Sequence, residues 1–192
     1  MSSYAQKLTW RLFVSAMPLF FGGLVIVLPV LHVSYGFSVS FFIGACLSSF
    51  LLLIAIFDFQ YGLIFDRLLA PMLLIGSWFR FAFPLDAWPQ PGMGLLVGAG
   101  ILFLLRLLSQ GGIGMGDVKM AGVLGLWLGT EGILLTLMLA FLLGGLCAAW
   151  LLCRQSHAWR DQIPFGPFLS CSAWLVYLYG RTFLTVYGEL WL

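Results

Sequence analysis

Residues 37–57, FSVSFFIGACLSSFLLLIAIF, form an uncharged run that ends directly before Asp58. Such a run is long enough to cross a bilayer as an α-helix, because the hydrocarbon core is about 30 Å thick and needs about 20 apolar residues. The whole chain is similarly apolar and poor in charge. Of its 192 residues, 62% are hydrophobic and 8% are charged, whereas soluble domains average about 45–50% apolar and about 25% charged residues. The sequence therefore predicts a polytopic membrane protein with almost no soluble part.

Apolar runs divide the chain into about seven predicted spans, and each should be α-helical because backbone groups in hydrocarbon must be satisfied internally. The predicted spans are 10–33, 37–57, 68–84, 92–108, 118–130, 131–153 and 163–187. Gly and Pro clusters mark the breaks, at Pro84, Pro89-Gln-Pro91-Gly92, Gly111-Gly112 and Gly129-Thr-Glu-Gly132. The predicted fold class is an all-α transmembrane helix bundle. Residues 1–36 are interpreted as a retained signal-anchor span, and residues 37–192 as the membrane core.

Basic residues are unevenly distributed between the two sides that a seven-span topology defines. The N-terminus and the loops 58–67, 106–119 and 154–162 share one side, which carries seven of the nine Lys and Arg residues. These seven are Lys7, Arg11, Arg67, Arg106, Lys119, Arg154 and Arg160, against Arg80 and Arg181 on the other side. Because cytoplasmic loops carry the excess of Lys and Arg, we predict that the first side is cytoplasmic.

Gly114-Met-Gly-Asp-Val-Lys119 places a carboxylate, Asp117, between two apolar segments, where a charge is costly and usually functional. Gly114 and Gly116 leave the neighbouring backbone open to close approach by another chain. The seven-span topology puts Asp58 and Asp117 at the same membrane depth and on the same face.

Two such carboxylates, if they lie within a few ångströms, share a proton and titrate as a coupled pair. One acts as a general base on water, while the other, protonated, polarises a carbonyl group. An aspartic peptidase needs this chemistry. The alternative is structural: Asp117 pairs with Lys119 or Arg106 at the membrane interface, and Asp58 caps a loop.

Three motifs occur in order along the chain. Asp58 is followed eight residues later by Asp66, Gly114-Met-Gly-Asp117 continues as Val-Lys-Met-Ala-Gly, and Ile163-Pro-Phe-Gly-Pro-Phe-Leu169 precedes the last apolar run. Together they resemble the type IV prepilin peptidases, which belong to the GxGD membrane aspartic peptidases. The resemblance covers roughly residues 37–187.

The resemblance implies that Asp58 and Asp117 are the catalytic pair of an aspartic endopeptidase. Its substrate would be a type IV prepilin or a type II secretion pseudopilin, whose short basic leader is cut after a glycine at the cytoplasmic face of the bacterial inner membrane. It implies no metal and no cofactor. The expected partners are this substrate and the lipid bilayer. Nucleic acid is not expected, since the net charge is only +2 and no basic run occurs.

Other residues near the motifs have less certain roles. Asp66 is interpreted as a loop or substrate contact rather than an acid in the chemistry. Lys119 either anchors its helix at the interface or holds the aspartate pair or a peptide carboxylate. Pro164, Gly166 and Pro167 are expected to shape the start of the last helix beside the site, because Pro fixes φ and Gly permits close packing.

The chain departs from the family pattern in two ways. Many members carry a cytosolic domain with paired CxxC motifs after the first span and also methylate the new pilin N-terminus. Here only about four residues separate the first two spans, and the four cysteines form no CxxC pair. We therefore expect no methyltransferase activity. Phe65 replaces the proline that usually precedes the second acid of the first motif, which indicates a divergent loop.

Two other functions are compatible with parts of the sequence. A non-catalytic membrane bundle, either transporter-like or an inactive relative acting in pilus or secretion assembly, would also contain broken helices and intramembrane acids. Transporters place polar residues near the bilayer midplane, however, whereas these acids lie near the ends of the predicted spans. A signal-peptide or presenilin-like peptidase is disfavoured by the residues after Asp117 and by the Pro-Phe-Gly-Pro run.

Overall fold

The structure, a computed structural model, describes residues 2–83, 90–153 and 164–191. Within these ranges every regular element is an α-helix, which confirms the predicted all-α class. The helices are α1 (Ser2–Tyr35), α2 (Val39–Tyr61), α3 (Asp66–Ala82), α4 (Pro91–Leu108), α5 (Met115–Cys153) and α6 (Gly166–Trp191). Several residues used in the sequence analysis lie outside the described ranges, namely Pro84, Pro89, Arg154, Arg160 and Ile163.

Helix α5 consists of two helical arms that meet at Gly129, where φ is 69° and ψ is −176°. Both arms contact one residue of α4, because a Cβ at Gly98 would meet Ala121 from the first arm and Ile133 from the second. In a straight helix these two residues would lie about 18 Å apart. The chain therefore reverses at Gly129, whose positive φ favours glycine. This break lies within the predicted Gly129–Gly132 cluster, and it gives the described residues seven helical segments.

The turn between α2 and α3 is shorter than the sequence predicted. Helix α2 continues past residue 57 to Tyr61, and α3 begins at Asp66. Gly62 ends α2 in the left-handed region, with φ 62°, and its N–H donates to the Asp58 carbonyl oxygen at 2.8 Å. Asp58 therefore lies in the last turn of a helix and not in a loop.

Glycines bring α4 and the first arm of α5 into backbone contact. A Cβ at Gly94 would collide with the carbonyl oxygen of Gly125, and a Cβ at Gly98 with that of Ala121. Gly122 lies against the methyl group of Ala99. Small residues at such spacing allow close helix packing in membranes, where burial from water drives little association between helices.

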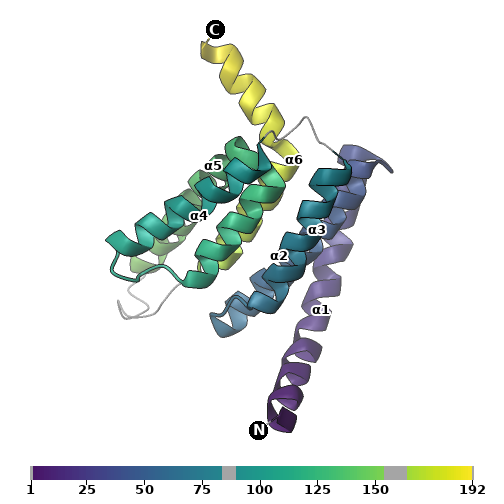
Figure 1. The fold of residues 1–192 in the computed structure, drawn as a ribbon, viewed down its shortest axis with the longest axis vertical. Coiled ribbons are helices and arrows are strands. Elements are labelled where there is room, and N and C mark those ends of the chain that lie inside the picture. The colour runs from purple at the N-terminus through teal and green to yellow at the C-terminus, as the bar shows by residue number, and fades with distance from the viewer. Residues whose placement is uncertain (1, 84–89, 154–163, 192) are drawn as a thin grey trace.

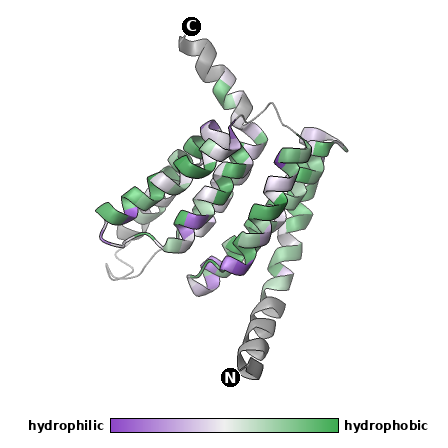
Figure 2. Ribbon diagram, in the orientation of Figure 1, coloured by the Kyte–Doolittle hydropathy of each residue, from purple (hydrophilic) through white to green (hydrophobic). Residues whose placement is uncertain are grey.

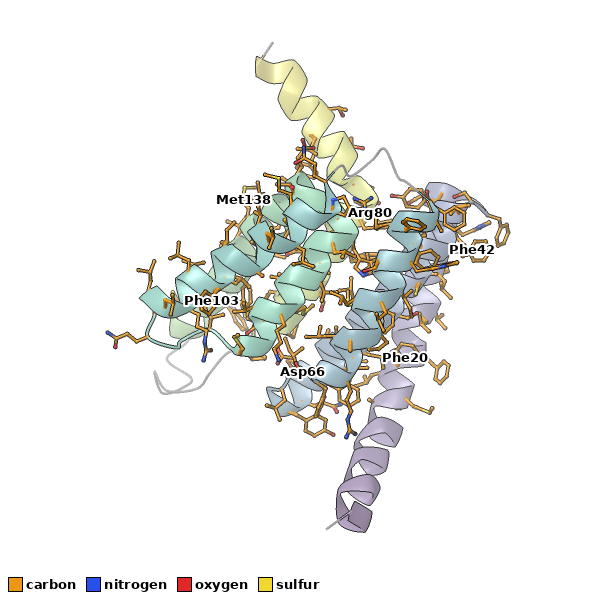
Figure 3. The ribbon with its side chains drawn as sticks, in the orientation of Figure 1. Phe20, Phe42, Asp66, Arg80, Phe103 and Met138 are labelled. Carbon is orange, nitrogen blue, oxygen red and sulfur yellow. The ribbon has the colours of Figure 1, made fainter. Side chains whose placement is uncertain are left out.

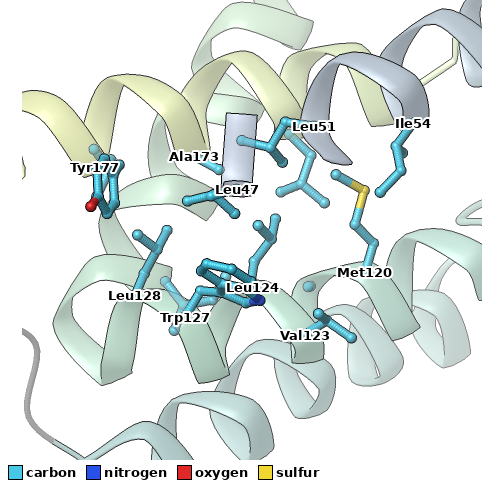
Figure 4. Packing of buried hydrophobic residues seen from close by; sticks show 14 of the residues in the cluster. Leu47, Leu51, Ile54, Met120, Val123, Leu124, Trp127, Leu128, Ala173 and Tyr177 are labelled. Atoms are coloured by element: carbon cyan, nitrogen blue, oxygen red, sulfur yellow. The ribbon is translucent and has the colours of Figure 1, made fainter. Parts of the chain in front are cut away.

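The core joins α2, the first arm of α5 and α6. Leu47 and Leu51 of α2 lie near Leu124 of α5, and Ala173 and Tyr177 of α6 belong to the same cluster, with Ala173 beside Leu47 (Figure 4). The Tyr177 hydroxyl also donates to the Ser40 carbonyl at 2.6 Å, which ties α6 to the first turn of α2. This packing fixes the position of α6 beside α2.

The outer surface suits a lipid environment. Among the residues that the structure describes, four helices are long and apolar enough to cross a membrane, over Ala16–Tyr35, Val39–Tyr61, Pro91–Leu108 and Met115–Trp150. Large apolar side chains point outward, as at Val33 and Phe81, which are 86% and 92% exposed. Hydrophilic residues gather near the helix ends (Figure 2). The chain is therefore a multi-pass membrane protein.

Several helix ends meet at one end of the bundle. The N-terminus of α1, the end of α2, the start of α3, the end of α4 and the start of α5 all lie toward the lower end in Figure 1. Arg80, in the last turn of α3, lies at the opposite end (Figure 3). Asp58 and Asp117 therefore occupy the same end of the molecule, as the seven-span topology predicted.

Candidate active site

Asp58 lies in the last turn of α2, and its side chain contacts the start of α6. It is 5% exposed, and its Oδ2 accepts a hydrogen bond from the backbone N–H of Gly166 at 2.8 Å. A Cβ at Gly166 would lie 2.6 Å from the same oxygen, so only glycine allows this approach. The contact also points the N-terminus of α6 at a carboxylate, and that end of a helix attracts negative charge.

Asp117 lies in the first turn of α5, where the loop from α4 ends. Its Oδ2 contacts Gly114, since a Cβ there would lie 2.8 Å from this oxygen. Its Oδ1 is buried and has no hydrogen-bond partner. A buried polar atom without a partner is costly and needs an explanation, such as a bound water or a substrate group.

The two aspartates belong to one site. They come from different helices, and the charge of Asp58 acts on the carboxyl group of Asp117. The structural alternative is not realised among the described residues, since Asp117 forms no ion pair there and the Asp58 side chain binds Gly166. Gly114 and Gly166 each lie against one of the two carboxyl groups.

The first turn of α5 also packs on the α2–α3 turn. A Cβ at Gly116 would lie 2.8 Å from the Cβ of Ile64. Gly116 therefore allows close approach by Ile64 of the same chain, whereas the sequence analysis expected the approach of another chain. No pattern in the sequence pointed to Ile64.

Arg106 is a further residue whose role the sequence did not reveal. It lies in the last turn of α4, and its Nη1 donates to the Ile113 carbonyl oxygen, directly before Gly114. This contact closes the loop between α4 and α5 and limits where Asp117 can lie. A basic residue in the last turn of a helix often binds nearby carbonyl groups, and that rule was the available signal.

Lys119 and Asp66 pair with each other. The Lys119 ammonium group donates to both carboxylate oxygens of Asp66, at 2.9 and 2.7 Å. Asp66 is the first residue of α3 and faces the start of α5 (Figure 3). The two side chains are 67% (Asp66) and 47% (Lys119) exposed, so the pair lies at the surface and joins α3 to α5. Lys119 therefore donates to Asp66 and not to Asp58 or Asp117.

The start of α6 meets the prediction in part. Gly166 begins α6 and contacts Asp58 directly. Pro167 occupies the next position, where a residue's N–H has no partner within the helix, so the missing N–H of proline costs no hydrogen bond. Pro164 lies two residues before the helix and is partly buried. Among the described residues, no group of three or more His, Cys, Asp or Glu side chains has the arrangement of a metal site.

This arrangement is chemically suited to activating water. Asp58 is buried and Asp117 is partly buried; a backbone donor fixes the first, and one oxygen of the second is unpartnered. Such a pair holds a proton between its members and offers both a base and an acid to a bound carbonyl compound.

Comparison with known proteins assigns the same region to a family. The model of the type IV leader peptidase family matches residues 45–149, which include Asp58, Asp66 and Asp117 but not the start of α6. No solved structure matches the chain significantly.

Curated relatives match over most of the chain, and each bears the name prepilin leader peptidase/N-methyltransferase. The relative from Bacillus subtilis is 29% identical over 81% of this chain and 62% of its own length. That from Burkholderia pseudomallei is 34% identical over 76% of this chain and 50% of its own length. That from Pseudomonas putida is 32% identical over 76% and 52%, respectively. The chain therefore spans between half and two thirds of the length of these relatives.

Proposed function

The chain belongs to the type IV leader peptidase family, and from that premise we propose that it is an aspartic endopeptidase that cuts the leader from prepilins or pseudopilins. Asp58 and Asp117 form the catalytic pair of this proposal. The observation that carries it is that Asp58, which is buried, and Asp117, which is partly buried, lie at the ends of two apolar helices that meet at one end of the bundle (Figure 1).

The proposed reaction is hydrolysis of one peptide bond. One carboxylate takes a proton from water, and the water oxygen attacks the carbonyl carbon of the bond. The other carboxyl group, protonated, donates a hydrogen bond to the carbonyl oxygen and stabilises the charge that develops there. The C–N bond then breaks, and the leaving nitrogen takes up a proton from the pair.

The environments of Asp58 and Asp117 differ in a way that suits these two roles. The N–H of Gly166 holds Asp58 in place before substrate arrives, which lowers the cost of ordering the site. The unpartnered Oδ1 of Asp117 is available to the attacking water or to the substrate. The ion pair of Lys119 and Asp66 lies outside this centre and supports the positions of α3 and α5.

The proposed substrate has a short basic leader followed by an apolar helix. Its helix would lie among the apolar spans, and its leader would cross the aspartate pair at the membrane surface. We propose that this surface is the cytoplasmic face of the bacterial inner membrane, because the excess of Lys and Arg lies on that side of the predicted topology. The names of the relatives support the substrate class.

The test is co-expression of candidate prepilins with the wild-type chain, Asp58→Asn and Asp117→Asn. The wild type is expected to shorten the prepilin by its leader, as seen on a gel and by mass spectrometry of the product. Each Asn variant is expected to accumulate uncut prepilin, because an amide neither takes a proton from water nor shares one with its neighbour. Asp66→Asn is the matched control and should still cut.

Two results would separate this function from a non-catalytic role. If wild type and both Asn variants left every prepilin uncut yet still supported pilus or secretion assembly, the chain would act as an assembly partner. If one Asn variant cut at the wild-type rate, the paired mechanism would be wrong. Membrane levels of each variant, measured by immunoblot, ensure that lost cleavage is not lost protein.

We also propose that the new N-terminus stays unmethylated. Only Gly36, Phe37 and Ser38 separate α1 from α2, at the place where many family members carry a cytosolic domain. Mass spectrometry of the mature pilin tests this directly, and a product one methyl group heavier than the cut sequence would contradict it.

A further inference from the structure

Two phenylalanines at the start of α6 contact the second arm of α5, which carries neither aspartate of the proposed pair. The ring of Phe165, directly before α6, lies 5.2 Å from the ring of Phe141, centroid to centroid, with the two planes at 31°. Phe165 and Phe168 both lie over Gly144, since a Cβ there would be 3.9 Å from the first ring and 3.8 Å from the second. We call Phe141, Gly144, Phe165 and Phe168 the aromatic anchor.

The anchor is joined to Asp58 by a single peptide group. The N–H that donates to Asp58 Oδ2 at 2.8 Å belongs to the peptide bond between Phe165 and Gly166. The carbonyl oxygen of the same peptide group accepts from the Leu169 N–H at 3.0 Å. A peptide group is planar and includes the Cα atom that carries the preceding side chain. The orientation of this plane, and with it the donor to Asp58, therefore depends on where the Phe165 ring is held.

The surroundings of the anchor leave room for that ring to move. An apolar cavity of about 320 Å³ lies beside it, lined by Phe141, Gly144, Gly145, Ala148, Phe165 and Phe168. Helices in a bilayer associate through direct packing, because lipid tails are as apolar as the side chains. Aromatic pairs with centroids 4.5–7 Å apart contribute beyond the area that they bury. The contact between the Phe141 and Phe165 rings is therefore the interaction that sets the position of Phe165.

We propose that the aromatic anchor positions Asp58 through the peptide group of Phe165 and Gly166, so that Phe141 and Phe165 are positioning residues of the reaction. This inference rests on the proposed peptidase function. It gives the second arm of α5, which contributes no acid, a part in orienting the Asp58 carboxyl group. Both rings act through the backbone donor and not on the substrate.

Cleavage kinetics test the proposal. Phe141→Leu and Phe165→Leu keep an apolar side chain and remove the ring–ring contact, so each should lower kcat about 2- to 10-fold, the range of one aromatic pair. KM should stay within about twofold, because the orientation of Asp58 matters in the chemical step and not in binding. Phe141→Trp keeps an aromatic ring, and the cavity has room for the larger side chain. It should restore kcat to within about twofold of the wild type.

Leu142→Ala is the matched control. Leu142 is the next residue on the same arm and is 57% exposed. Its substitution should leave kcat and KM unchanged, and membrane levels of every variant are compared by immunoblot. A loss of kcat in Leu142→Ala equal to that in Phe141→Leu would overturn the proposal, because any truncation of this arm would then suffice.

A double variant tests whether the anchor acts through Gly166. In Gly166→Ala the new methyl group already displaces the Asp58 carboxyl group, since it would lie 2.6 Å from Oδ2. Adding Phe141→Leu to Gly166→Ala should therefore lower kcat by less than about twofold more, because residues that act as a unit are not additive. Losses that multiply in the double variant would contradict the proposed route.

Hydrogen exchange of the Gly166 amide tests the anchor without substrate. The full-length protein is placed in vesicles of phosphatidylethanolamine and phosphatidylglycerol, and exchange is followed by mass spectrometry with fragmentation. Phe141→Leu should speed exchange at Gly166 about 2- to 10-fold and leave α4 unchanged. Unchanged exchange at Gly166, or an equal increase in α4, would contradict the proposal.

Failure of the proposed function and failure of this inference give different results. If the wild type cuts no prepilin, the proposed function fails and the catalytic part of the inference fails with it. Exchange at Gly166 then still decides whether the anchor holds the donor. If the wild type cuts and both leucine variants keep the wild-type kcat, only the positioning role is overturned. A rise in KM at constant kcat would also overturn it, because the rings would then act in substrate binding.

Discussion

The last turn of α2 and the first turn of α5 each supply one aspartate, but they hold it in different ways. Asp58 is almost fully buried and is fixed by a backbone N–H from a third helix, α6. Asp117 lies where a loop ends, and one of its oxygens is unpartnered. Helix packing therefore positions Asp58, whereas the loop from α4 positions Asp117. Substitutions around the two turns should therefore lower the cleavage rate for different reasons.

Removing either carboxyl group should lower activity more than any other substitution. Asp58→Asn and Asp117→Asn should each lower the cleavage rate about 10²–10⁴-fold, the usual contribution of general acid–base groups. The double variant should be no worse than the poorer single variant, because residues that act as a unit are not additive. Single-turnover cleavage of a purified prepilin measures all three rates. A double variant with multiplied losses would indicate two independent roles.

Gly166→Ala tests the side fixed by helix packing. The new methyl group would lie 2.6 Å from Asp58 Oδ2, so the carboxyl group must move. Displacement of a reacting group by about 1 Å can cost about 10²-fold in rate, and we expect a loss of that size.

Gly145→Ala is the matched control for this substitution, because no atom lies within 4 Å of the new Cβ. It should leave the cleavage rate unchanged and raise the free energy of unfolding by up to about 1 kcal/mol, the difference in helix propensity. Equal losses for the two variants would show that alanine in these helices, and not contact with Asp58, lowers activity.

Arg106→Met tests the side that depends on the loop. It keeps the apolar stem of the side chain and removes the donor to the Ile113 carbonyl. If the lost hydrogen bond destabilises the ordered loop by about 1.4 kcal/mol, the cleavage rate should fall about tenfold. Hydrogen exchange of the amides in residues 109–114 should become faster, while exchange in α2 stays the same. Unchanged exchange in the loop would contradict this role for Arg106.

The smallest effect is expected at the surface ion pair. Lys119→Met or Asp66→Asn breaks a contact between largely exposed side chains, and such pairs contribute about 0–1 kcal/mol. The cleavage rate should fall by less than about fivefold. A loss as large as that of Asp58→Asn would move Asp66 into the chemistry and would require a different account of the site.

Much of the bundle was predictable because the physics of a bilayer is simple. Long apolar runs become helices, and glycine and proline mark their ends. The break at Gly129 was indicated by the Gly129-Thr-Glu-Gly132 cluster between the predicted spans 118–130 and 131–153. Placing Asp58 and Asp117 at one end of the bundle required only counting spans and basic residues.

The finer features depend on packing that a single sequence does not encode locally. Asp58 lies inside α2 because Gly62 ends that helix four residues later, and apolar runs do not report such caps. The pairing of Lys119 with Asp66 and the contact of Gly116 with Ile64 depend on how α3 and α5 are set against each other. The sequence analysis predicted only that Gly166 helps to shape the start of the last helix beside the site. It did not predict the hydrogen bond from its N–H to a carboxyl oxygen of Asp58.

The N–H of Gly166 has a consequence for the time at which the proposed site is assembled. Asp58, Asp117 and Gly166 leave the ribosome in that order, and Gly166 is the first residue of α6. Until α6 is inserted against α2, Asp58 lacks its backbone donor. The proposed centre is therefore incomplete in a nascent chain until α6 has been made and has packed against α2.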